Sequence, residues 1–190
     1  DVERSRGLGD VYKRQEQVEV ENYFPELRQN LEHLYLALYF CEVADYFTRE
    51  GMTAKHELNL LYLSLRALSV PSLPEELVRY IYEFRMLAIA GEAPRIFECI
   101  RCGKTENLHH FYVGDAGIVC DDCHDGKTGI LLSETAIYTL QRILSSPLQK
   151  LYTFSVSEAV LAQLKEVVSR YFKAHTDRTF HSLDMLDIGF

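Results

Sequence analysis

The feature that most constrains this chain is a pair of CxxC motifs. Cys99 and Cys102 form the first, Cys120 and Cys123 the second, and seventeen residues separate Cys102 from Cys120. Two motifs at this separation place four thiolates where a single tetrahedral Zn²⁺ can bind them all. One CxxC alone would leave a redox dithiol as a strong rival. We therefore predict one bound zinc ion, with a disulfide pair or a chance spacing as the alternative.

The predicted zinc is structural. A catalytic zinc keeps one coordination position open for water, whereas four cysteines complete the tetrahedron. His109, His110 and His124 lie near the motifs and could replace a ligand in principle. Because four thiolates already satisfy the ion, we interpret these histidines as surface or packing residues.

The residues between the motifs predict a two-stranded hairpin. Residues 108 to 113 form an apolar and aromatic run, the sequence Gly-Asp-Ala-Gly at 114 to 117 is typical of a turn, and Ile118 and Val119 lead into Cys120. Gly103 gives the chain freedom to turn after the first motif. The sequence thus predicts a small zinc ribbon.

Length and composition place the chain among proteins with one hydrophobic core. With 190 residues, 47% of them hydrophobic, we expect one domain, or one domain with a small insert. No run of about eighteen uncharged apolar residues occurs, so no membrane span is predicted. The start lacks the apolar core of a signal peptide, and reduced cysteines at metal spacing indicate the cytoplasm.

The charge argues against a basic nucleic-acid-binding surface. The formal net charge is −8. Between residues 95 and 128, six acidic side chains outnumber four basic ones, and four thiolates around one Zn²⁺ add further negative charge. We expect the ribbon to repel phosphate and to serve as a staple for a loop that has no core of its own.

The first fifteen residues have neither a strand nor a helix period. They resemble a translated sequencing-adapter tail, so we treat residues 1–15 as a disordered, non-native leader. This interpretation predicts that the native chain began earlier and that its N-terminal part is missing.

Apolar residues at helical spacing predict three helices before the ribbon. The first is a long helix from Pro25 to Gly51, the second covers residues 54–68, and the third covers residues 75–90 with Pro74 as its first residue. Cys41 is interpreted as a small buried core residue, with a reactive thiol as the alternative. The predicted core faces are Leu27, Leu31, Leu34, Leu38 and Cys41; Leu58, Leu61, Tyr62, Leu65 and Leu68; and Leu77, Ile81, Phe84 and Ala88.

Two further helices are predicted after the ribbon. Ser133 is a candidate N-cap for a helix over residues 134–144, and Ser155 with Glu158 forms a capping-box pattern that opens the last helix. The predicted fold is mainly α: a helical bundle with an inserted four-cysteine zinc ribbon that contains a small β-hairpin. The predicted division is residues 16–95 and 132–190 for the two parts of the helical domain and 96–131 for the insert.

A resemblance to a known family rests on the residues that lead into the ribbon. The run Glu83-Phe84-Arg85-Met86-Leu87, followed by Ala90-Gly91, Pro94 and a CxxCG motif, is similar to the segment of the bacterial RecO family in which a helix leads into a four-cysteine finger. The resemblance extends from about residue 20 to residue 187. Zinc ribbons occur on many folds, so the order of helices around this one carries the resemblance.

The resemblance implies a DNA repair and recombination mediator and not an enzyme. RecO proteins act with RecR, engage the acidic C-terminal tail of single-stranded-DNA-binding protein, load RecA and anneal complementary strands. An N-terminal OB fold is expected to bind most of the single-stranded DNA. At most residues 15–21 would belong to that fold, so this chain is expected to bind partners but to bind DNA poorly.

An acidic tail that ends in an aromatic residue calls for an apolar groove edged by basic side chains. Arg79 and Arg85, near several aromatic residues of the third predicted helix, are our candidates for partner binding. The alternative is that they are solvated or paired with Glu75, Glu76 or Glu83.

Two other classes of function remain as rivals. The first is a metalloenzyme or thiol enzyme, against which the sequence has no HExxH motif, glycine-rich phosphate loop or nucleophile elbow. The second is a helical adaptor or transcription-associated protein that uses the ribbon for protein contacts. Such a protein would bind neither RecR nor the acidic tail.

Overall fold

The computed structural model describes residues 22–126 and 129–187, so the predicted leader and the possible OB-fold remnant lie outside the described residues. The elements are η1 (Pro25–Arg28), α1 (Leu31–Phe47), α2 (Lys55–Leu68), α3 (Glu75–Ile89), β1 (Leu108–Tyr112), β2 (Gly117–Cys120), η2 (Asp121–Cys123), β3 (Ile130–Leu131), α4 (Glu134–Ser145), η3 (Leu148–Lys150), α5 (Glu158–Ala174) and α6 (His181–Asp187). The predicted class, mainly helical with a small sheet, is confirmed. None of the described helices combines the length and apolar character that crossing a membrane requires.

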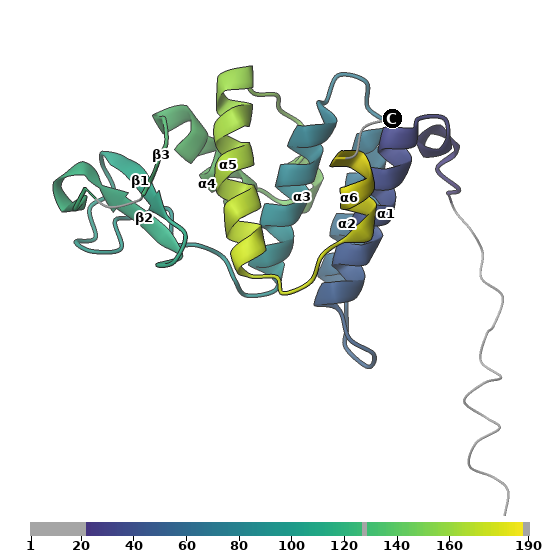
Figure 1. Ribbon diagram of the computed structural model, residues 1–190, viewed down its shortest axis with the longest axis horizontal. Helices are drawn as coiled ribbons and strands as arrows, with labels where there is room; N and C mark the ends of the chain where they lie inside the picture. Colours follow the sequence, from purple (N-terminus) through teal and green to yellow (C-terminus); the bar gives the residue numbers. More distant parts are fainter. Residues whose placement is uncertain (1–21, 127–128, 188–190) are drawn as a thin grey trace, which may run out of the picture.

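Helix α3 lies at the centre of the bundle, and α1, α2, α4 and α5 pack around it (Figure 1). Its side chains are buried on nearly every side, including Leu77, Ile81 and Phe84 as predicted. Tyr82 donates a hydrogen bond from its hydroxyl to the carbonyl oxygen of Phe40 at 2.7 Å, which ties α3 to α1. A helix that buries residues on nearly every side, the charged Glu83 among them, requires such a surround of other helices.

The predicted first helix is two elements. Of its predicted core face, Leu27 is buried as expected, but Leu31, Leu38 and Cys41 are exposed. The side chain of Asn30 accepts hydrogen bonds from the backbone N–H groups of Glu32 and His33, so α1 begins only at Leu31. Leu31 and Leu38 are 47% and 46% exposed. The buried face consists of Leu36, Ala37, Tyr39, Phe40, Val43 and Ala44. Both faces have helical spacing, and the one with the larger aromatic side chains is buried because it removes more apolar area from water.

The structure also corrects the predicted burial of Cys41 and of two residues of α2. Cys41 is exposed on the outer side of α1, so its interpretation as a buried core residue is wrong. In α2 the predicted residues Leu58 and Tyr62 are exposed, whereas Leu60 and Ser64 face the interior. Ser64 can lie inside because its hydroxyl donates to the carbonyl oxygen of Leu60 at 2.7 Å.

Of the two N-caps predicted after the ribbon, the first is confirmed and the second is wrong. Ser133 caps α4 as predicted, with its side chain accepting a hydrogen bond from the N–H of Ala136. The cap of α5 is Ser157, which accepts from the N–H of Val160, and not Ser155. Serine is a favourable N-cap residue at both positions, so residue type alone does not tell which of the two serines caps the helix.

Before the ribbon, Pro74 lies at the N-cap of α3 and not inside the helix.

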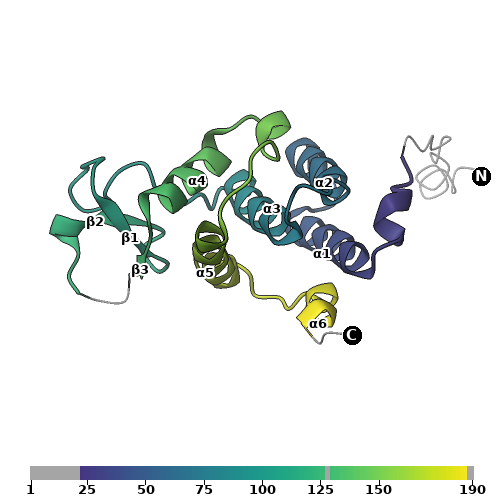
Figure 2. The same cartoon turned by 90° about the horizontal axis from the view of Figure 1, so that it is seen from above.

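The sheet forms one end of the long axis of the molecule, and η1 lies toward the other (Figures 1 and 2). Its strand order is β2-β1-β3, with β1 antiparallel to both neighbours. The predicted hairpin is present, and the third strand, in which Ile130 pairs with Phe111, was not predicted. A two-residue strand carries too short a pattern to be recognised from sequence.

A last helix, α6, was also not predicted and packs on α1 (Figure 2). Phe180, just before it, is buried against the rings of Tyr39, Tyr46 and Phe172. The hydroxyl of Ser182 donates to Glu42 at 2.8 Å. Phe180, the partly buried Leu183 and a few polar contacts thus attach the end of the described chain to the bundle.

Candidate metal centre

The first CxxC motif forms a tight turn that is closed by backbone hydrogen bonds. The N–H of Gly103 donates to the carbonyl oxygen of Cys99 at 2.8 Å, and the N–H of Cys99 donates to the carbonyl oxygen of Lys104 at 2.7 Å. Gly103 has φ = 76°, a left-handed conformation that favours glycine. The turn directs the side chains of Cys99 and Cys102 to the same side.

The second motif lies at the end of β2 and in the short helix η2. Cys120 is the last residue of β2, where it pairs with Leu108 of β1. After the η2 turn, the N–H of His124 donates to the carbonyl oxygen of Cys120 at 3.0 Å. The first motif is joined to this strand, since the N–H of Ile100 donates to the carbonyl oxygen of Ile118 at 3.0 Å. The sheet therefore brings the two turns face to face.

The four predicted ligands come together. The sulfur atoms of Cys99, Cys102, Cys120 and Cys123 all lie within 4.8 Å of one another, and the sulfurs of Cys102 and Cys120 are 3.6 Å apart. Four thiolates around one tetrahedral zinc, with Zn–S bonds of about 2.3 Å, would stand roughly 3.8 Å apart. All five cysteines, all within the described residues, are free thiols, and Cys41 is not part of the cluster. The donor set and its size fit one metal ion.

The thiols of the cluster differ in how readily they lose their protons. Burial raises the pKa of the Cys99 thiol, but hydrogen bonds from the backbone N–H groups of Cys120, Arg101 and Cys102 outweigh it and lower the pKa to about 6. Hydrogen bonding to the other cysteine sulfurs, Cys102 first, raises the pKa of Cys123 to about 12. Burial also raises the pKa of Cys120. Without an ion, the cluster thus holds a thiolate at Cys99 and protons at Cys120 and Cys123 near neutral pH.

The three nearby histidines have partners outside the sulfur cluster. His109 approaches both carboxylate oxygens of Asp121 at 3.0 Å. The rings of His110 and His124 stack with centroids 3.6 Å apart, and His124 also contacts the hydroxyl of Tyr112 at 2.8 Å. The cluster is complete with four sulfurs and does not include these rings.

Among the described residues of the ribbon, the basic side chains of Arg101 and Lys104 are paired with acidic ones. Lys104 contacts Asp122 at 2.6 Å, and Arg101 contacts Asp125 at 3.1 Å while its guanidinium lies over the ring of Tyr112. These pairs leave little positive potential for a phosphate backbone, in line with the acidic composition of the segment.

Two contacts that the sequence did not predict fix the ribbon on the bundle. Phe111 of β1 meets the ring of Tyr171 in α5 edge-on at 5.6 Å, and Tyr171 in turn meets Phe84 of α3 at 6.3 Å. The side-chain amide of Gln141 in α4 donates to the carbonyl oxygen of Ile96 at 2.7 Å. The sequence places Tyr171 on the apolar face of α5, but it does not show that Tyr171 contacts Phe111. It likewise does not indicate that the side chain of Gln141 binds the backbone of Ile96.

The two predicted partner-binding arginines are engaged inside the bundle. Arg79 donates from Nε to a carboxylate oxygen of Glu83 at 2.7 Å, and Glu83, which is 1% exposed, accepts a second hydrogen bond from the hydroxyl of Tyr39 at 2.6 Å. Arg85 donates to the carbonyl oxygens of Ile143 and Leu144 at the end of α4. The structure therefore places the two arginines in separate contacts and does not bring them together.

Comparisons with known proteins agree on one family. The family model described as "Recombination protein O C terminal" matches residues 28–184. A protein named DNA repair protein RecO from Acetivibrio thermocellus is 32% identical over 170 residues, which cover 88% of this chain and 67% of that relative. RecO relatives from Symbiobacterium thermophilum and Bacillus pumilus are 29% and 26% identical, covering 90% and 92% of this chain and 70% and 67% of their own.

Proposed function

The chain belongs to the RecO family of DNA repair proteins, and we propose that it works as a mediator of homologous recombination. In this role it acts with RecR and single-stranded-DNA-binding protein, supports loading of RecA and takes part in strand annealing. One observation carries the proposal: the family match runs continuously through the bundle and the four-cysteine ribbon, from residue 28 to residue 184.

The proposed role involves no chemical step. A closed set of four sulfurs leaves no coordination position for a substrate, and the ribbon is tied to the bundle through Phe111 and Gln141 like a structural module. We propose that the bound ion is one structural Zn²⁺, because four thiolates at this spacing suit zinc best among common metals.

Single-stranded DNA is proposed to bind chiefly through an OB fold that the family resemblance implies, and not through this ribbon. The pairing of Lys104 and Arg101 with acidic side chains supports this view. We therefore expect this chain to bind a single-stranded oligonucleotide weakly, and its affinity to change little between about 50 and 200 mM salt. Tight, steeply salt-dependent binding in an anisotropy titration would place a DNA surface on this chain.

Arg79 and Arg85 remain the proposed contacts for the acidic tail. Binding there would require a carboxylate of the tail to share Arg79 with Glu83, which already occupies its Nε. Replacing Arg79 alone would leave the buried Glu83 without its cation and destabilise the fold. A fair test therefore replaces both residues, Arg79→Met with Glu83→Gln, and compares this double variant with Arg85→Met.

The experiment that tests the function is binding of purified partners. A labelled peptide that copies the acidic C-terminal tail should bind this chain in an anisotropy titration, and a scrambled peptide of the same composition should bind more weakly. RecR should coelute with the chain in gel filtration. A helical adaptor or transcription-associated protein would fail both tests, and that result would overturn the proposed role while leaving the metal centre intact.

A further inference from the structure

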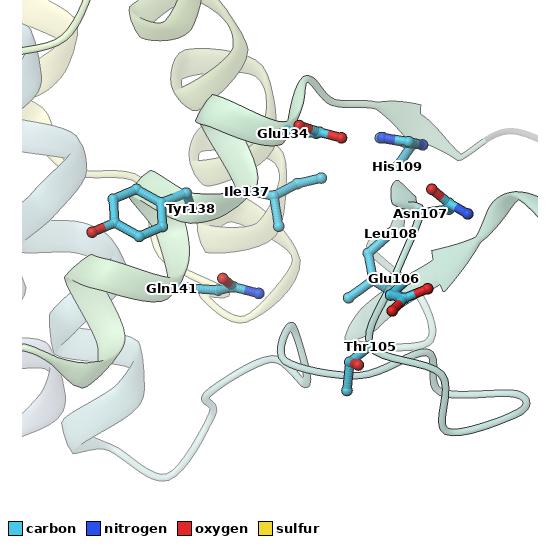
Figure 3. Close-up of a pocket in the computed structure, with 9 residues that line it drawn as sticks. All are labelled: Thr105, Glu106, Asn107, Leu108, His109, Glu134, Ile137, Tyr138 and Gln141. Carbon is cyan, nitrogen blue, oxygen red and sulfur yellow. The ribbon is translucent and has the colours of Figure 1, made fainter.

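A groove runs along the outer side of α4, between the bundle and the ribbon. It consists of two adjoining hollows, with cavity volumes of about 360 and 410 Å³, and both are lined by Tyr138 and Gln141. The first hollow lies between the first half of α4 and residues 105–109 of the ribbon (Figure 3). The second lies between Phe97 and the last turn of α4. We call the two together the α4 groove.

The walls of the α4 groove expose large apolar side chains. Tyr138 is 63% exposed and Phe97 is 51% exposed, although the bundle buries most of its other aromatic residues. Figure 3 shows Ile137 pointing from α4 toward Leu108 of the ribbon, and both of these residues are buried. An apolar floor with exposed aromatic rings beside it is typical of surfaces that bind other proteins.

The two ends of the α4 groove carry opposite charge. Glu106 and Glu134 line the end at the start of α4, whereas Arg142, in its last turn, and Lys150, in η3, line the other end. Within the described part of the chain, none of these four side chains takes part in an ion pair, in contrast to the paired charges around the metal cluster. Glu134 and Arg142 are eight residues apart on one helix, which is about 12 Å along its axis.

We propose that the α4 groove binds an extended peptide segment of a partner protein that carries both charges. Its basic residue lies by Glu106 and Glu134, a large apolar residue packs between Tyr138 and Phe97, and its acidic residue lies by Arg142 and Lys150. An extended chain covers about 12 Å in roughly four residues, so the two charges flank the apolar residue at a separation of about four. The acidic end excludes a nucleic acid strand, whose phosphates it would repel. This proposal goes beyond the mediator role and does not depend on the partners named for it.

The test uses three capped peptides with the same aromatic centre: Lys-Ser-Phe-Ser-Asp, an acidic version with aspartate at both ends, and a basic version with lysine at both ends. Binding to the isotope-labelled full chain is followed by NMR chemical shifts, which detect weak complexes. The mixed-charge peptide should bind about fivefold more tightly than either other peptide at low salt, as expected for two exposed ion pairs. The shifts should centre on Phe97, Tyr138 and Gln141.

Variants separate the apolar from the charged part of the proposal. Tyr138→Ala should weaken all three peptides by about tenfold, whereas Leu131→Ala, an exposed apolar residue on β3 that does not line the groove, should change nothing. Glu134→Lys leaves its end neutral, because Glu106 remains there, and should remove the preference for the mixed-charge peptide over the acidic one. Lys150→Glu leaves the other end neutral beside Arg142 and should remove the preference over the basic peptide.

Four results would overturn the proposal: equal binding of the three peptides, best binding of the acidic peptide to the parent chain, shifts located elsewhere, or no binding of any peptide. Displacement of the mixed-charge peptide by a short oligothymidine would instead identify the groove as a nucleic-acid surface.

Discussion

In the bundle, α3 is enclosed by other helices, and large side chains such as Tyr82 and Phe84 are fully buried around it. In the ribbon, Phe111, Ile118 and Val119 are fully buried and belong to the same core cluster, and four cysteine sulfurs gather at the two CxxC turns. Burial of apolar area therefore stabilises both regions, and we expect the proposed ion to stabilise the ribbon in addition. Two parts of one molecule that differ in this way should respond differently to the same change.

Removal of the metal ligands should separate the two regions most strongly. In Cys120→Ser we expect the metal content to fall well below the one ion per chain that we propose for the parent, since metal binding contributes about 10 kcal/mol or more to folding of such sites. The ribbon should become sensitive to protease while the helical circular-dichroism signal is largely kept. Cys41→Ser, which replaces the exposed thiol on α1, is the control and should behave like the parent. A Cys120→Ser protein that keeps its metal and resists digestion would contradict the dependence of the ribbon on the ion.

Removal of buried area should affect the bundle and spare the ribbon. Phe40→Ala should lower the free energy of unfolding by about 3–5 kcal/mol, because Phe40 is fully buried. Leu38→Ala on the same helix should change it by less than about 1 kcal/mol, since Leu38 is 46% exposed. Urea unfolding measures both values, and metal content should stay the same in both. Equal losses would show that α1 presents a different face to the core.

Acid should release the ion before it affects the bundle. The pKa of Cys123 is about 12 and that of Cys120 is raised, so both sulfurs of the metal-free cluster bind protons that the ion must displace. Cys99, with a pKa of about 6, is already a thiolate at neutral pH. Between pH 8 and pH 6 the affinity for metal should therefore fall at least about 100-fold per pH unit, which corresponds to displacement of at least the two protons of Cys120 and Cys123. Competition with a chromophoric chelator across this range measures the slope, and a slope near zero would show that the thiols are deprotonated before the metal binds.

Of the four predicted changes, a methyl group added at Gly117, where the hairpin meets the first CxxC motif, should have the smallest effect. A Cβ atom at Gly117 would lie 2.3 Å from a methyl carbon of Ile100 and 3.1 Å from the carbonyl oxygen of Arg95. We expect Gly117→Ala to cost about 1–3 kcal/mol and to weaken metal retention. Gly114→Ala is the matched control, because nothing lies within 4 Å of that position. If both variants have the same melting temperature and metal content, the close approach is not a constraint.

The difference between the ribbon and the bundle also explains how much of each could be predicted from the sequence. Spacing alone predicted that the four cysteines come together, because a metal needs particular atoms at particular intervals, and an apolar run with a turn sequence predicted the hairpin. In the bundle, the positions and types of the helices were predicted well, but the inward face of α1 was not. Leu31, Leu38 and Cys41 follow helical spacing as regularly as the buried residues Leu36 and Phe40 do, and only packing against α3 and α6 decides between the two faces.

Features that depend on contacts between residues far apart in the sequence could not be predicted. Helix α6 is short and is held by Phe180 in a setting of aromatic rings from α1 and α5, so its own sequence gives little indication of a helix. The pairing of Arg79 with Glu83 is one that the sequence offered as an alternative to partner binding, whereas the contact of Arg85 with the end of α4 could not be predicted. The α4 groove needs three separate segments to meet and has no motif of its own.

The hydrogen bonds from Arg85 to the last turn of α4 have a consequence for how the molecule opens. They join the two helices that flank the ribbon in sequence, so the whole insert forms a loop whose ends are held together by the bundle itself. Transient opening of the ribbon therefore need not separate α3 from α4, and the amide protons of β1 and β2 should exchange with solvent in fast local events of their own. Those of α3 should exchange only in the slow, global unfolding of the chain.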